Sequence, residues 1–314
     1  MPDASPARAA VAALAVARVL AACGDAPPAP SPRTVGPVRG EPGSGAGLAS
    51  LRTGPPYREG SVPPAAGAVV GRVTLRGPAV DPVYEAWPGM GTDVPTPAGR
   101  VVVGEGAALA DVVVVLVGVT GGKPFPPTPR GEGDRLRLVA EAGRVRPFVS
   151  VVRVGTQLEL ENRLRGTWVV HGFEGAEAGR TAFNVSVEPG AILTDVVELW
   201  LGAPGVTFVT EDGRGAFHAY VVAVPHPYVD VTRAVARGDV GPGGFRLADV
   251  PPGAYDVVAW HPGLSMRARG DGRPSRYVAS APVEAIAHVT VRPGAVVDVA
   301  FEFEAPGAGG SSGR

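Results

Sequence analysis

Short runs of β-branched and aromatic residues dominate the pattern between Val69 and Glu304. Glycine, proline or aspartate bounds each run, turns recur roughly every ten residues, and no amphipathic helical period interrupts them, which is typical of sandwiches and barrels. We therefore predict an all-β protein with two Greek-key-type β-sandwich domains in tandem. The expected strands are Val69–Leu75, Val112–Val117, Phe148–Val154, Gln157–Glu161, Ala191–Leu201, Val206–Thr210, His218–Val224, Ala254–Trp260 and Val296–Phe303.

The segment Gln157–Glu161 alternates polar and apolar residues with a period of two. This period places the two leucines on the inner face of a strand and the two carboxylates on the outer face. Glu159 and Glu161 could in principle act as an acid–base pair. Their expected position on an exposed face favours a solvated stripe.

The N-terminal residues have the layout of a signal peptide. Arg8 precedes an apolar stretch, Ala9–Leu20, which ends in small residues before Cys23. About a dozen apolar residues are too few to span a bilayer as a helix. We predict a signal peptide over residues 1–22.

The residues Leu20-Ala21-Ala22-Cys23 resemble the lipobox of bacterial lipoproteins. The resemblance implies that Cys23 is lipidated and becomes the mature N-terminus, so that the protein is anchored in the cell envelope on the periplasmic or outer-membrane side. The alternative is a secreted protein whose cysteine is incidental.

Glycine, proline, alanine and serine are dense in the segment that follows Cys23 and at the C-terminal end. Neither stretch has apolar periodicity, so residues 23–66 are expected to form a lipidated, disordered tether and residues 305–314 a disordered tail. The folded part is then expected between residues 67 and 304.

Composition excludes several classes of protein. The 29 basic and 30 acidic residues give a net charge of −1, which offers no electrostatic footprint for nucleic acid. A single cysteine rules out internal disulfides and cysteine metal clusters. The His-Glu-x-x-His, Gly-x-Ser-x-Gly and Gly-Lys-Ser/Thr patterns do not occur. The absence of these patterns makes an enzyme less expected, and the copper-ligand positions discussed below are the reason to predict that the protein is not an enzyme.

The segment from Val69 to about Tyr228 resembles a bacterial family of secreted cupredoxin-like proteins of the methylamine-utilisation or plastocyanin-like type, which implies a cupredoxin-like domain at residues 67–225. About half of the chain is covered. The matching motifs are Gly71–Gly77, Leu109-Ala110-Asp111 leading into Val112–Leu116, Arg146–Val149, Val154–Asn162, Ala219-Tyr220 and His226-Pro227-Tyr228.

That family holds a type 1 copper with two histidines, a cysteine and usually a methionine, because a thiolate and imidazoles suit both copper redox states. The resemblance places these ligands at positions that here hold Trp168, Glu211, Arg214 and Phe217, so no copper cofactor is expected. A residual site at His171 and His218 is the alternative. Against it, structural and catalytic zinc sites normally take three or four protein ligands.

Residues 226–304 resemble the carboxypeptidase regulatory-like, transthyretin-type sandwich, which is usually a non-catalytic attachment. Gly244–His261, Val289–Gly294 and Val296–Phe303 carry this match. His226 and His261, each beside a proline, are interpreted as structural hydrogen-bonding residues. A sugar-stacking surface could be formed by Tyr228, Trp260 and Tyr277, with core packing as the alternative reading of the aromatic residues.

Together these features predict a non-catalytic cell-envelope lipoprotein that serves as a binding or structural module. The expected partners are the membrane, through the N-terminal lipid, and an envelope protein or polysaccharide. A periplasmic copper-binding protein with a histidine site is the alternative function.

Overall fold

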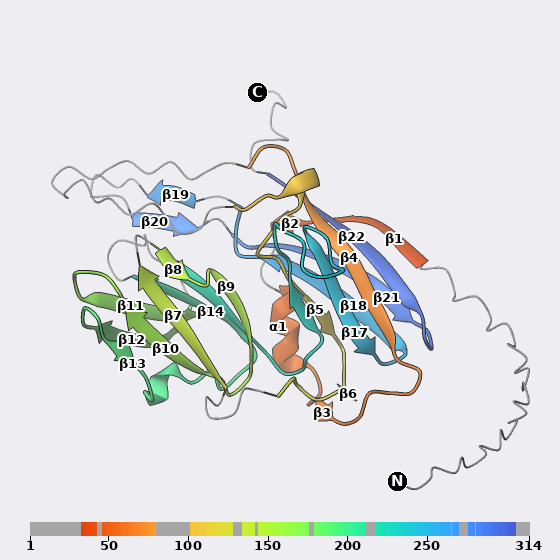
Figure 1. The fold of residues 1–314 in the computed structure, drawn as a ribbon, viewed down its shortest axis with the longest axis horizontal. Coiled ribbons are helices and arrows are strands. Elements are labelled where there is room, and N and C mark those ends of the chain that lie inside the picture. Colours follow the sequence, from red (N-terminus) through yellow and green to blue (C-terminus); the bar gives the residue numbers. More distant parts are fainter. Residues whose placement is uncertain are drawn as a thin grey trace, which may run out of the picture. The chain divides into compact units, whose positions relative to one another are not determined.

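The computed structural model describes residues 33–42, 46–79, 101–127, 134–141, 144–175, 179–211, 218–264, 266–269, 276–279 and 281–305. The described residues all belong to one compact unit. Its regular structure is almost entirely β and builds two sandwiches, which confirms the predicted all-β sandwich class (Figure 1). Within the described residues, no helix is long and apolar enough to cross a membrane.

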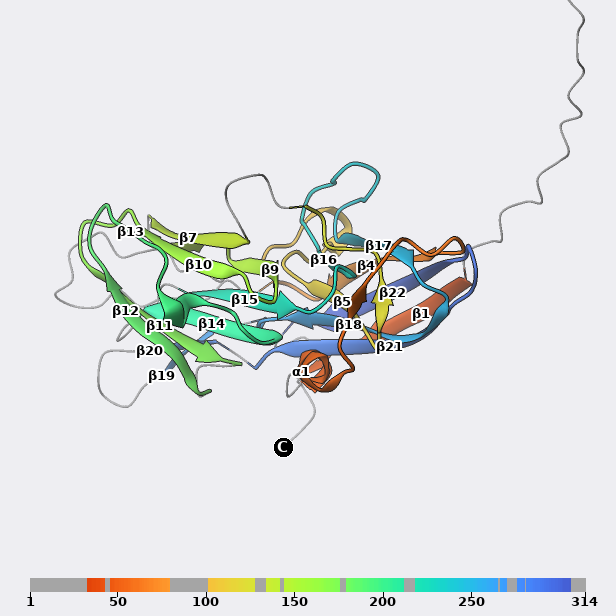
Figure 2. The same cartoon turned by 90° about the horizontal axis from the view of Figure 1, so that it is seen from below.

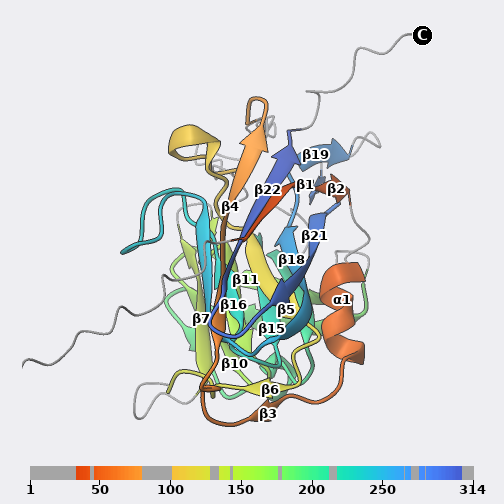
Figure 3. The same cartoon turned by 90° about the vertical axis from the view of Figure 1, so that its right-hand side faces the viewer.

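The first sandwich, here called sandwich I, combines strands from both ends of the chain. They are β1 (Arg33–Arg39), β2 (Glu41–Pro42), β4 (Gly67–Arg76), β5 (Val113–Val117), β16 (Val229–Val231), β17 (Gly244–Val250), β18 (Gly253–His261), β21 (Val283–Val291) and β22 (Val296–Glu304). One sheet has the order β1-β22-β4-β17, and the other has the order β16-β5-β18-β21-β2. Figure 3 shows β1, β22 and β4 side by side in the first of these sheets.

The second sandwich, sandwich II, is formed by consecutive strands from the middle of the chain. They are β7 (Arg135–Glu141), β8 (Arg144–Arg146), β9 (Val149–Arg153), β10 (Gln157–Asn162), β11 (Trp168–Glu174), β12 (Thr181–Val187), β13 (Ile192–Leu193), β14 (Gly205–Glu211) and β15 (His218–Val224). The sheet orders are β13-β10-β7-β8 and β12-β11-β14-β15-β9. In Figure 2 these two sheets form separate layers.

Smaller elements complete the described part. They are α1 (Ala46–Thr53), the 3-10 turns η1 (Glu105–Ala107) and η2 (Val197–Leu199), and the short strand pairs β3 (Arg58–Glu59) with β6 (Gly121–Gly122) and β19 (Met266–Arg269) with β20 (Arg276–Ala279).

Strand β5 is apolar without interruption because both of its faces are buried. Val114 and Leu116 point into the core of sandwich I. Val113 and Val115 point the other way, into an apolar layer that includes Tyr220 of sandwich II. A strand covered on both faces loses the alternation of polar and apolar residues. The run of valines therefore marks the layer in which the two sandwiches pack together.

The predicted division of the chain into tandem domains at residues 67–225 and 226–304 is wrong. Strand β4 pairs with β17 and β22, and β5 pairs with β16 and β18, so strands from both predicted domains share sheets. Sandwich II, at residues 135–224, is inserted between β5 and β16 of sandwich I. Non-local strand pairing of this kind leaves no mark in local hydrophobic periodicity.

The predicted disordered tether is also wrong for the part of residues 23–66 that is described. Strand β1 pairs in parallel with β22, and β2 pairs with β21. Helix α1 buries Leu48 and Leu51 in the layer between the sandwiches. Two leucines spaced three residues apart lie on one face of a helix, so even this short segment has an apolar side to bury.

Strand β10 confirms part of the predicted alternation. Leu158 and Leu160 are fully buried in the core of sandwich II. Glu159, however, is only 8% exposed, because Arg135 and Arg137 cover its carboxylate at 3.1 and 2.9 Å. The outer face of this strand carries a charge-paired layer where a freely solvated stripe was expected.

Candidate functional site

Several predicted site residues lie outside the described part of the chain. Cys23 precedes it, and Arg214 and Phe217 fall in the segment between β14 and β15. Tyr277 lies on β20, where side chains are not described. The proposed roles of these residues stay predictions.

The two described positions from the copper-ligand resemblance lie toward one end of sandwich II. Trp168 begins β11 and is completely buried in the core. Glu211 ends β14 and is in register with Val170, a core residue two positions from Trp168. Because cross-strand partners point to the same face, Trp168 and Glu211 both face the inside of the sandwich. The position aligned with the first copper histidine is therefore a core tryptophan.

His171 and His218 lie on the opposite face of that sheet, each in register with Thr210 of the strand between them. The His171 ring stacks on Phe173, and its Nε2 lies 3.1 Å from Oγ1 of Thr181 on β12. His218 is buried against aromatic rings, including Phe148. The two imidazoles thus make separate contacts on opposite sides of β14. Among the described residues, no group of three or more potential ligands is placed to hold a metal.

Two of the three residues predicted to form a sugar-stacking surface are buried, so that prediction is wrong for them. Tyr228 is 0% exposed, and its hydroxyl accepts a hydrogen bond from the Lys123 amide at 3.0 Å. Trp260 is 1% exposed and packs edge-on against Tyr220 between the sandwiches. Tyrosine and tryptophan often bury their rings while a polar atom finds a partner, as Tyr228 does here.

His226 and His261 are also buried. Burial lowers the pKa of both imidazoles to about 4, because the charged form cannot be solvated. The ring of His226 packs beside Tyr57 and Tyr228, and Nδ1 of His261 accepts a hydrogen bond from the Gly263 amide at 3.2 Å. Both histidines are thus neutral parts of the packed structure near pH 7.

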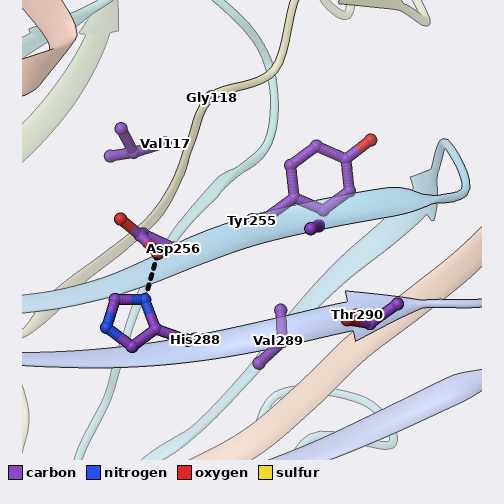
Figure 4. A pocket seen from close by; sticks show the side chains of 8 residues that line it. Val117, Gly118, Tyr255, Asp256, His288, Val289 and Thr290 are labelled. Atoms are coloured by element: carbon purple, nitrogen blue, oxygen red, sulfur yellow. Dashed lines mark hydrogen bonds and ion pairs between the residues drawn. The ribbon is translucent and has the colours of Figure 1, made fainter.

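A histidine that the sequence analysis did not single out contacts a carboxylate on the surface of sandwich I. His288 on β21 faces Asp256 on β18, with Nδ1 2.5 Å from Oδ1 (Figure 4). The pair lines a shallow hollow of about 350 Å³ beside Val117 and Thr290. The His288 side chain is 83% exposed, so water competes with this contact and the pair has little energetic weight.

A larger cleft of about 580 Å³ lies where strand β16 of sandwich I meets strand β9 of sandwich II. Each of these strands is at the edge of its sheet. Polar and apolar residues line the cleft together; they are Asp111, Leu136, Pro147, Val149, Ser150, Val151, Val229, Asp230, Val231, Thr232, Arg233 and Arg237.

Asp111 is the most unusual residue of this cleft. Its φ angle is +60°, in the left-handed region that aspartate adopts more readily than most residues. Thr232 fixes this conformation: the Asp111 amide donates to the Thr232 carbonyl at 3.0 Å, and the Thr232 hydroxyl donates to the Leu109 carbonyl at 2.7 Å. The Val112 amide in turn donates to the same hydroxyl at 3.1 Å. The Asp111 backbone is therefore held in place by a buried threonine.

The carboxylate of Asp111 makes no hydrogen bond within the described chain. Burial raises its pKa to about 6, and the positive charge of Arg233 opposes that rise. A carboxyl group with a raised pKa that faces a cleft is a frequent mark of functional sites. An uncommon backbone conformation, such as the positive φ angle of Asp111, is also frequent at functional sites.

The second carboxylate of the cleft is fully engaged. Asp230 accepts two hydrogen bonds from Nη2 of Arg237, at 2.8 and 2.7 Å. It also accepts hydrogen bonds from the amides of Val231 and Arg246. These contacts neutralise Asp230 and Arg237 and hold them rigid.

Ser150 lines the cleft from β9 and is 8% exposed. Its hydroxyl oxygen has no hydrogen-bond partner within the described chain. Buried hydroxyl groups without partners are uncommon in folded proteins. The cleft wall therefore carries two polar groups, on Asp111 and Ser150, whose hydrogen bonding is incomplete.

Sequence reasoning missed this cleft. Asp111 entered only as the end of a Leu-Ala-Asp motif, and Thr232 and Arg233 were not considered. The only local sign of this site was the position of Asp111, an aspartate directly before the apolar run that contains strand β5. Nothing local in the sequence indicated that a segment about 120 residues later would fix it.

Comparisons with known proteins add little. The chain matches no protein-family model and no curated protein. Among solved structures, it is similar to a chain of a heme-copper terminal oxidase dimer, with 19% identity over 35% of this chain and 78% of that chain and a TM-score of 0.21. A likeness at that score carries no functional argument.

Proposed function

We propose that this protein is a non-catalytic binding module of the cell envelope, anchored through a lipid on Cys23, and that it binds a small ligand in the cleft between its two sandwiches. One observation carries the binding part of the proposal. It is the carboxylate of Asp111, which stands on a backbone held by Thr232 and lines a cleft of about 580 Å³ without a hydrogen-bond partner within the described chain.

The size and position of the cleft support binding of a small molecule. Ligand sites typically have volumes of roughly 300–1,000 Å³ and often lie where structural units meet. The layer between the sandwiches contains Leu48, Tyr220 and Trp260, all nearly fully buried. A well-packed layer of this kind keeps the two walls of the cleft at a fixed separation.

The lining of the cleft favours binding over catalysis. Its described residues include no histidine, cysteine or lysine beside Asp111. Acid–base and nucleophilic mechanisms usually pair a titratable group with a second one within hydrogen-bond reach. Asp230 does not fill that role, because its oxygens already accept hydrogen bonds from Arg237 and two backbone amides.

The structure changes which kind of partner is favoured. A polysaccharide partner was expected to stack on Tyr228 and Trp260, and both are buried. The cleft itself is lined by aliphatic and charged residues, without an aromatic ring among those described. These features support a small charged ligand ahead of a polymer.

A thermal-shift screen of small metabolites tests the binding proposal. We expect at least one compound to raise the melting temperature of the wild-type protein, and not that of Val151→Trp, which enlarges a residue of the cleft lining and whose fold is verified by circular dichroism. Val197→Trp, on a side chain that is 80% exposed and lies outside the cleft, is the matched control. A screen in which every active compound works equally on all three proteins contradicts a site in the cleft.

Mass spectrometry of the protein from membranes tests the anchor. We expect a mature chain that begins at Cys23 and carries fatty acyl groups. A chain that still begins at Met1 would contradict the lipoprotein assignment, and would leave the cleft unaffected.

A further inference from the structure

The cleft offers two charged side chains that no hydrogen bond or ion pair joins to another described residue. Asp230 and Arg237 neutralise each other through two hydrogen bonds. Asp111 and Arg233 also line the cleft, and no hydrogen bond or ion pair of the described residues joins their side chains to a partner. One carboxylate and one guanidinium therefore remain for a ligand.

Asp111 and Arg233 lie on the same wall. Thr232 hydrogen-bonds to the backbone of Asp111 and is the chain neighbour of Arg233. The two charges are near enough for the guanidinium to lower the pKa of the carboxyl group against the effect of burial. A ligand on this wall therefore meets a negative and a positive group a short distance apart.

The facing wall is mostly apolar. Leu136, Pro147, Val149 and Val151 from sandwich II line it, together with Ser150. Aliphatic side chains at this wall favour a ligand with an apolar body, since burying methylene groups away from water is favourable. The cleft thus combines one anionic group, one cationic group and an aliphatic surface.

We propose that the cleft binds a zwitterionic amino acid or short peptide with an aliphatic side chain. Its ammonium group lies at Asp111, its carboxylate lies at Arg233, and its side chain packs on Pro147 and Val151. This inference rests on the proposed function and specifies its ligand. A simple amine would meet the positive charge of Arg233, and a simple acid would meet the negative charge of Asp111, so a ligand with both charges fits best.

Isothermal titration calorimetry at pH 7.5 on the full mature protein tests the proposal with matched compounds. The probes are leucine, leucyl-leucine, glycine, 3-methylbutylamine and 4-methylpentanoate. We expect leucine or leucyl-leucine to bind, and the amine, the acid and glycine to bind at least about tenfold more weakly, because each lacks one recognised group. Whichever of leucine and leucyl-leucine binds more tightly shows whether the ligand is a free amino acid or a peptide.

Variants assign the contacts. Asp111→Asn and Arg233→Gln are each expected to weaken binding by about tenfold or more, because each leaves one ligand charge without its partner. Asp239→Asn and Arg165→Gln are the matched controls, since both residues are exposed and lie outside the cleft. Circular dichroism and the melting temperature verify that all four variants fold.

The possible failures are distinguishable. If the amine alone binds, or if Arg233→Gln binds leucine as the wild type does, the zwitterion assignment is wrong. If no amino acid or peptide binds while another compound stabilises wild type but not Val151→Trp, the ligand class is wrong and the binding function stands. If nothing in either experiment depends on the cleft, both proposals fall.

Discussion

The backbone amide of Gly47 donates a hydrogen bond to Oε2 of Glu284 at 3.1 Å, although the two residues are 237 positions apart. The Leu48 amide donates to the other carboxylate oxygen at 3.3 Å. The first turn of α1 is thereby capped by β21 of sandwich I. At the other end of the helix, Nε of Arg52 donates to the Pro204 carbonyl in sandwich II at 2.6 Å. Helix α1 therefore joins the two sandwiches.

Glu284→Ala is expected to lower the free energy of unfolding by about 2 kcal/mol. The substitution leaves two helix amides without acceptors and removes a negative charge from the positive end of the helix. Glu304→Gln is the control, because Glu304 is exposed at the end of β22. Urea denaturation of both variants measures the difference, and equal stability would contradict the role of Glu284 as a cap.

Leu48→Ala is expected to lower the free energy of unfolding by roughly 2–5 kcal/mol, as is usual for truncation of a buried leucine. Leu48 is 2% exposed and packs in the layer between the sandwiches. Val197→Ala, at an 80% exposed side chain, is expected to change stability by less than about 0.5 kcal/mol. Thermal denaturation followed by circular dichroism checks both. If Leu48→Ala has the stability of the wild type, this segment is the loose tether that its composition suggests.

The helix shows where sequence reasoning stops. Strand periodicity predicted the all-β class, and the buried leucines of β10 followed from alternation. Glycine and proline content predicted a tether, because composition does not register that Leu48 finds a buried site more than a hundred residues away. The domain boundary failed for the same reason. The pairing of β4 with β22 is a contact across more than 200 residues, and only the folded chain reveals it.

Asp111→Asn is expected to stabilise the protein at pH 8. The folded-state pKa of about 6 lies above the ordinary value of 3.8, so the folded state binds the proton more tightly. Stability is therefore lost as pH rises from about 4 to 6, by up to roughly 3 kcal/mol. Asparagine avoids this cost and tolerates the left-handed backbone. The positive charge of Arg233 opposes the rise in the Asp111 pKa and so limits this loss of stability. The other charged residues of the cleft, Asp230 and Arg237, neutralise each other.

Urea denaturation between pH 4 and pH 8 measures this difference. We expect the gap between Asp111→Asn and wild type to be largest above pH 6 and to vanish near pH 4. A variant that is less stable than wild type at pH 8 would show that the carboxylate has a stabilising partner. If the variant gains stability and loses ligand, Asp111 is retained for binding at a cost in stability.

His226→Phe is expected to make the protein more resistant to acid. The folded-state pKa of about 4 lies below the ordinary value of 6.5, so stability is complete above pH 6.5 and is lost as pH falls toward 4. The difference amounts to roughly 3 kcal/mol at most. Phenylalanine keeps the ring contacts with Tyr57 and Tyr228 and does not take up a proton. Thermal denaturation at pH 7 and pH 4.5 should show a smaller decrease for the variant, and an equal decrease would contradict burial of a neutral imidazole.

Copper titration is expected to give no stoichiometric, high-affinity binding to the mature protein. His171 contacts Thr181 on β12, while His218 packs against Phe148 on the other side of β14. Their strands are separated by β14, roughly 10 Å apart at the usual spacing, whereas metal–nitrogen bonds measure about 2 Å. Convergence on one ion would require His171 to leave both its stacking partner and its hydrogen bond. Bound copper per chain should therefore be the same in wild type and His171→Ala. If the wild type binds one copper per chain and His171→Ala binds none, the histidine site exists. Copper binding would then explain the function of this protein better than the cleft does.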